Sequence, residues 1–132
     1  MNEDYAIVSV LKGLAQNETL EYLDLSWNSL CGEPFGKVLS KSIKLSNLRT
    51  LKMEHNRMST FELKKLSLGL KYAKTIEEVY IGDNLILNRE DVNLINVFKS
   101  KSPLKLLSFG KWFHLSREAF NVIFCTIFFC TI

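Results

Sequence analysis

The stretch LEYLDLSWNSL, at positions 20–30, decides the fold of this 132-residue chain. Leu23 and Leu25 are separated by one residue, which is the spacing of side chains that share one face of an extended strand. Tyr22 and Asp24 alternate with them and therefore point to the opposite side. The stretch predicts a short strand with one apolar face and one polar face.

The same pattern returns at fixed distances along the chain. LRTLKMEHNRM at 48–58 and IEEVYIGDNLI at 76–86 each begin 28 positions after the block before them. A looser fourth block, LKLLSFGKWFH at 104–114, keeps the strand's apolar positions but has Trp112 in place of the asparagine and His114 in the last apolar place. A fixed period of this length predicts stacked supersecondary units, each too small to bury its apolar side alone.

The segments between the blocks have a different periodicity. Their apolar residues lie three or four positions apart, which is the spacing of one face of a helix. Each unit is therefore predicted to be a strand followed by a helix, with an additional helix over residues 5–15. The residues that carry the helical spacing are Phe35, Val38, Leu39, Ile43, Leu63, Leu66 and Leu70.

One asparagine follows each of the first three strands. Asn28, Asn56 and Asn84 are 28 positions apart. A side-chain amide both donates and accepts hydrogen bonds, so it can satisfy main-chain groups that a tight, buried turn would leave unpaired. We expect the three asparagines to form a ladder with a structural role.

The three complete blocks fit L-x-x-L-x-L-x-x-N-x-L, and on these residues the chain resembles the leucine-rich-repeat superfamily. The resemblance covers roughly residues 5–125 and is closest to the 28-residue class, that of ribonuclease inhibitor and of the repeat regions in nucleotide-binding innate-immune receptors. It implies an α/β solenoid, a horseshoe segment with a parallel sheet on its concave side and helices on its convex side. It also implies a protein-interaction module that binds a partner protein through the concave face.

The chain is expected to be a single domain, residues 1–132, which the 28-residue period divides into repeats. The expected parts are an N-terminal partial repeat at 1–19, full repeats at 20–47, 48–75 and 76–103, and a degenerate last repeat with an apolar tail at 104–132.

The polar positions of the strands are the candidate partner-binding residues. Aromatic side chains carry much of the binding energy at protein interfaces, and three lie at these positions. Trp27 is either such an anchor or packs locally against Asn28 and the neighbouring turn, and the charged residues either complement a partner or are solvated. The predicted set is Tyr22, Asp24, Trp27, Lys52, Glu54, His55, Tyr80 and Asp83.

Composition and motifs argue against several other functions. The net charge of +3 comes from 17 basic and 14 acidic residues in no concentrated block, so no nucleic-acid partner is expected. Phosphate-loop, dinucleotide and zinc-protease motifs are missing from the sequence. No Cys or second His stands at ligand spacing from His55. We therefore expect no catalysis, metal, cofactor or small-molecule substrate, and we interpret Cys31 as a small buried hydrophobic residue.

The two ends of the chain bear on its cellular compartment and on alternative functions. The acidic start does not have the pattern of a secretory signal, and an odd count of three cysteines favours a reducing, cytoplasmic setting. The stretch 119–132, AFNVIFCTIFFCTI, is uncharged and apolar. It is either a last helix and strand, a membrane-associating tail, or the exposed end of a fragment of a longer repeat protein. A regulatory subunit or GTPase-regulator-like repeat protein is a further alternative.

Overall fold

The protein is described by a computed structural model that covers residues 3–84, 97, 100–110 and 114–116. Helices and strands alternate over residues 3–84. In order, the elements are α1 (Glu3–Gln16), β1 (Tyr22–Asp24), α2 (Glu33–Leu45), β2 (Thr50–Lys52), α3 (Thr60–Tyr72), β3 (Glu78–Tyr80), β4 (Leu106–Ser108) and β5 (His114–Ser116).

The strands form one sheet in the order β1-β2-β3-β4-β5. The first four are parallel, and partner residues are 28 positions apart: Tyr22 pairs with Thr50, Thr50 with Glu78, and Glu78 with Leu106. The α/β class and the parallel pairing of these four strands confirm the expectation from the sequence.

The fifth strand corrects the expectation of a parallel sheet throughout. β5 pairs antiparallel with β4, and Leu107 lies opposite Leu115. Only residues 109–113 separate the two strands. A parallel pair needs a crossover of a dozen or more residues, whereas an antiparallel pair can be joined by a short turn.

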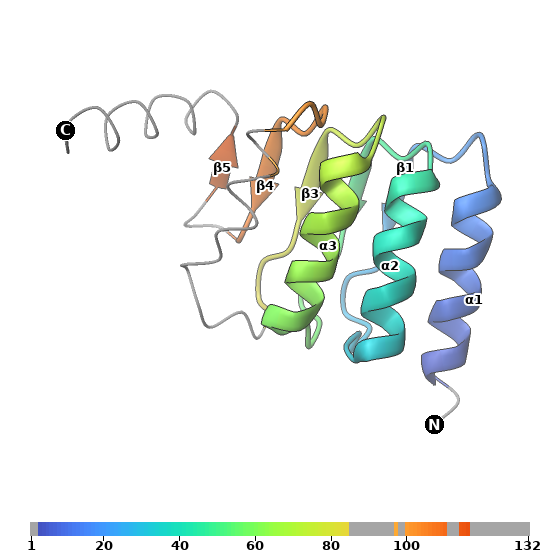
Figure 1. The fold of residues 1–132 in the computed structure, drawn as a ribbon. Coiled ribbons are helices and arrows are strands. Elements are labelled where there is room, and N and C mark those ends of the chain that lie inside the picture. Colours follow the sequence, from blue (N-terminus) through green and yellow to red (C-terminus); the bar gives the residue numbers. More distant parts are fainter. Residues whose placement is uncertain (1–2, 85–96, 98–99, 111–113, 117–132) are drawn as a thin grey trace.

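Helices α1, α2 and α3 stand side by side on one face of the sheet, α1 against α2 and α2 against α3 (Figure 1). The core lies between the two layers, because every second strand residue and one stripe of each helix face inward. Its fully buried members include Leu39, Leu48, Leu51, Leu66, Leu70, Val79 and Leu107.

Helices α2 and α3 approach each other closely at a glycine. A Cβ atom on Gly69 would lie 2.6 Å from the carbonyl oxygen of Ser40 in α2. That separation is shorter than any van der Waals contact, so the absence of a side chain at Gly69 allows the two backbones to pack.

Two predicted segments fall outside this description. The connector expected to contain a helix after the third strand is described only at Val97, which is helical and buried, and at 100–103. The apolar stretch 119–132 is not described. Among the described residues, no helix combines the length and apolar character needed to cross a membrane.

Candidate partner-binding face

The face of the sheet away from the helices carries the polar strand residues and is called here the open face. Strand side chains alternate between the two sides, so Leu51 and Val79 are buried under the helices while their neighbours point outward. The open face, with the turns at the strand ends, contains the eight predicted residues. They are Tyr22, Asp24, Trp27, Lys52, Glu54, His55, Tyr80 and Asp83.

Three of these residues form a connected row just beyond the strands. The rings of Trp27 and His55 are stacked, with centroids 3.7 Å apart and planes inclined by 12°. His55 Nε2 lies 3.2 Å from the Asp83 carboxylate. All three have positive φ angles, 63°, 51° and 54°, so equivalent turns aim their side chains in the same way.

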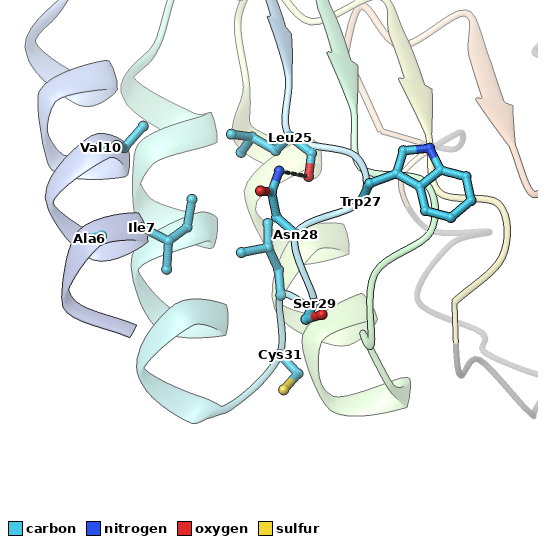
Figure 2. Close-up of a pocket in the computed structure, with 9 residues that line it drawn as sticks. Ala6, Ile7, Val10, Leu25, Trp27, Asn28, Ser29 and Cys31 are labelled. Atoms are coloured by element: carbon cyan, nitrogen blue, oxygen red, sulfur yellow. Dashed lines mark hydrogen bonds between the residues drawn. The ribbon is translucent and has the colours of Figure 1, made fainter. Parts of the chain in front are cut away.

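Trp27 is thus held in place while remaining open to solvent. The residue is 75% exposed, and its aromatic contact is with His55. Figure 2 shows the indole directed away from the side chains of α1 and from Leu25. The indole therefore packs on the neighbouring turn through His55, as the local-packing interpretation has it, and its role as a binding anchor stays a prediction.

A second group on the open face surrounds the ammonium of Lys52. Its Nζ atom lies 5.7 Å from the ring centroid of Tyr22 and 5.4 Å from that of Tyr80, within the range of cation–π attraction. A hydrogen bond with Tyr22 is the main cause that raises the pKa of Lys52. The cation thus lies between aromatic rings of the two neighbouring strands.

The carboxylate of Asp24 lies near this cation, and those of Glu78 and Glu54 lie near Tyr80. The pKa of Asp24 is lowered, chiefly by hydrogen bonds from Ser26, whose N–H donates to Asp24 Oδ1 at 2.9 Å. The pKa of Tyr80 is raised, first by burial and then by the neighbouring Glu78; Glu54 contributes in the same direction. The open face thus combines three aromatic residues with charges of both signs.

The asparagines connect successive turns through hydrogen bonds. Asn56 Oδ1 accepts from the N–H groups of Asn28 and Leu30 in the preceding turn, at 2.9 and 3.1 Å. Its Nδ2 donates to Leu25 O at 3.0 Å and to Met53 O at 3.1 Å. Asn56 is buried, and it satisfies main-chain groups of two consecutive turns.

The two other asparagines make subsets of these bonds. Asn84 Oδ1 accepts from Met58 N at 3.0 Å, and Asn84 Nδ2 donates to Met53 O at 2.9 Å. The amide of Asn28 donates within its own turn, to Leu25 O and Ser26 O at 3.0 and 2.9 Å. The ladder predicted from the sequence therefore has a definite geometry at Asn56 and Asn84.

A buried carboxylate that the sequence analysis missed also links neighbouring units. Glu62, in the first turn of α3, accepts from Ser59 N at 2.6 Å and from Gly32 N, in the loop before α2, at 2.7 Å. Burial raises the pKa of Glu62, but the hydrogen bonds from Ser59 and Gly32 outweigh it and lower the pKa overall. The Ser-x-x-Glu spacing of a capping box could have revealed the first contact; the second depends on tertiary packing.

A groove lies between α1 and the turn that follows β1. It encloses about 550 Å³ between α1 and the segment after β1, and Ile7, Val10, Leu30 and Cys31 are among the residues that line it. Figure 2 shows the α1 side chains on one side of it and Leu25 and Asn28 on the other. Cys31 is half-buried rather than fully buried, because it lies at the rim of this groove.

Across the described residues, no three His, Cys, Asp or Glu side chains cluster closely enough to hold a metal ion. The searches for relatives give no family: no protein-family model matches the chain, and no curated protein matches it in sequence.

Proposed function

We propose that the chain is a leucine-rich-repeat solenoid that binds a partner protein through its open face, the concave side of such a solenoid. Two features support the repeat assignment. Partner residues of the four parallel strands are 28 positions apart. Asn56 and Asn84 make the same kind of hydrogen bond to the turn before them.

The observation that carries the binding proposal is the exposed, stacked indole of Trp27. Exposing a tryptophan to water is costly unless a partner covers it, and tryptophan is enriched among residues that dominate binding energy. Stacking on His55 restricts the indole before any partner arrives, so less side-chain entropy is lost on binding. Tyr22, which is 51% exposed, is the second anchor.

The charges around the anchors would provide specificity. Lys52 lies between two tyrosines, and Asp24, Glu54 and Asp83 surround the aromatic positions. Exposed charges contribute little affinity individually, but their arrangement selects complementary partners and accelerates association. The proposal assigns binding and no reaction to this face. The odd number of cysteines favours a reducing, cytoplasmic setting for it.

The test is affinity capture from cell lysate followed by mass spectrometry and binding measurements with the purified partner. The native chain is compared with a variant that carries Tyr22→Ala, Trp27→Ala and Tyr80→Ala. Loss of even one dominant anchor costs about 2 kcal/mol, so the variant should bind at least about 30-fold more weakly.

A matched control removes exposed aromatic residues from the helical side. Tyr5 in α1 and Tyr72 in α3 are 76% and 52% exposed, and a Tyr5→Ala, Tyr72→Ala variant should capture the same partner as the native chain. If the open-face variant retains the partner, or if the control loses it equally, binding does not use the open face.

A further inference from the structure

The outer edge of β1 carries backbone groups that no other described residue pairs with. β1 is the terminal strand of the sheet. Its bonds to β2 use Glu21 O, which accepts from Thr50 N at 3.0 Å, and Leu25 N, which donates to Lys52 O at 2.8 Å. Alternate residues of a strand direct their backbone groups to opposite sides. The N–H and C=O groups of Tyr22 and Asp24 therefore face away from β2, toward the free edge.

Apolar side chains that are buried in the other units are exposed at this edge. Leu20 is 38% exposed, whereas its equivalents Leu48, Ile76 and Leu104 are between 0 and 1% exposed. Val10 of α1 is 49% exposed, whereas the equivalent Val38 of α2 is partly buried and the equivalent Leu66 of α3 is fully buried. In the interior units the preceding unit lies against these positions: β1 pairs with β2, and α2 packs against α3.

The turn after β1 also differs from the next turn in its hydrogen bonds. Asn56 Oδ1 accepts two main-chain N–H groups from the turn before it. Within the described part of the chain, no donor reaches Asn28 Oδ1, although the Asn28 amide is held by Leu25 O and Ser26 O. The apolar groove of Figure 2 lies beside this asparagine. The edge can therefore accept a strand and also the residues of a turn after it.

Charges indicate which strand fits. The position just before each parallel strand alternates in sign across the sheet, and neighbouring members form ion pairs. Arg49 lies 3.6 Å from Glu21 and 3.5 Å from Glu77, and Lys105 lies 3.3 Å from Glu77. Glu21 is the member on β1, the terminal strand, so a basic residue on the other side of it would continue the alternation.

We propose that the β1 edge binds an extended segment of a partner protein, in parallel register, with the pattern apolar-basic-x-apolar-x-apolar. The basic residue would pair with Glu21, and the apolar residues would cover Leu20, Leu23 and Leu25 and extend toward the groove. This is strand addition at a sheet edge, a common form of peptide recognition. A second copy paired through its own β1 would bring Glu18, Glu21 and Asp24 of both copies together, so the charges favour a basic partner.

The chain itself supplies the probe. A synthetic peptide with the sequence of residues 46–58, SNLRTLKMEHNRM, has the required pattern: Leu48, Arg49, Leu51 and Met53. It is titrated into the full chain while backbone amides are followed by NMR. We expect slower hydrogen exchange at the amides of Tyr22 and Asp24, since these would become paired.

The matched control is the same peptide with Arg49→Glu. An exposed ion pair changes affinity by about two- to five-fold, so the control peptide should bind more weakly by about that ratio. In a chain carrying Glu21→Gln the two peptides should bind almost equally, and circular dichroism verifies that this surface variant is folded. Tyr80→Ala, on β3 and away from the β1 edge, should leave peptide binding unchanged, which separates this proposal from binding at the open face.

Three outcomes would overturn the proposal. One is that neither peptide changes the exchange of the Tyr22 and Asp24 amides at millimolar concentration. Another is that the native chain binds the two peptides equally. The third is that sedimentation velocity detects a dimer that Leu20→Asp dissociates, which would assign the edge to a second copy.

Discussion

Replacing Asn56 by alanine tests the asparagine ladder most directly. In the native chain Asn56 Oδ1 accepts from the N–H groups of Asn28 and Leu30. Among the described residues no other acceptor reaches these two donors. The carbonyls bonded by Asn56 Nδ2 each retain a second donor, because Leu25 O also accepts from Asn28 and Met53 O from Asn84. The damage is therefore concentrated on two N–H groups.

The magnitude follows from where those groups lie. Leu30 is buried, and a buried donor without a partner costs about 1–3 kcal/mol. Asn28 is exposed, so water replaces most of its bond and the loss is about 0.5–1 kcal/mol. The free energy of unfolding should fall by about 1.5–4 kcal/mol in Asn56→Ala, a large part of the stability of a typical small domain.

Urea unfolding followed by circular dichroism measures the change, with Asn28→Ala as the matched control. Among the described residues, the Asn28 amide bonds only Leu25 O and Ser26 O of its own turn, so its loss should cost about 0.5–1 kcal/mol. The two variants remove the same chemical group and differ in whether it bridges two turns. Equal losses in the two variants would refute the assignment of stability to hydrogen bonds between units.

Three further predictions concern other contacts. Gly69→Ala should destabilise the chain by about 1–3 kcal/mol, because its methyl group would overlap a carbonyl of α2 at 2.6 Å. Gly13→Ala, with no atom within 4 Å of its added methyl group, should instead stabilise the chain by about 0.5–1 kcal/mol. Thermal unfolding compares the two variants. Glu62 has a lowered pKa, so its contribution to stability is present above the pKa of an unfolded glutamate and is lost as the pH falls through the folded-state pKa. In urea titrations from pH 7 to pH 3, the free energy of unfolding should fall less steeply in Glu62→Gln than in the native chain. An equally steep fall in the two chains would contradict this prediction. His55→Ala removes the ring stacked on Trp27, so NMR should show loss of the ring-current shift of the indole protons, and unchanged shifts would mean that the stack does not form in solution.

The sequence alone determined the arrangement within each unit. Alternating leucines at Leu23 and Leu25 define the buried face of a strand, and the spacing of Leu63, Leu66 and Leu70 defines the buried stripe of a helix. The 28-residue spacing also predicted the register, because stacked units of equal length place equivalent residues side by side. The outward positions of the candidate face follow from the same alternation.

Only the tertiary structure decided how neighbouring units touch. The antiparallel β5, the stacking of Trp27 on His55 and the contact between Glu62 and Gly32 each join residues from different turns or strands. The position of a side chain on its own strand or helix depends on backbone periodicity, which the sequence displays directly. Contacts between units depend also on turn conformation, such as the positive φ of Trp27 and His55, and on the close approach of packed elements. These are properties of the assembled chain, and the periodic pattern does not specify them.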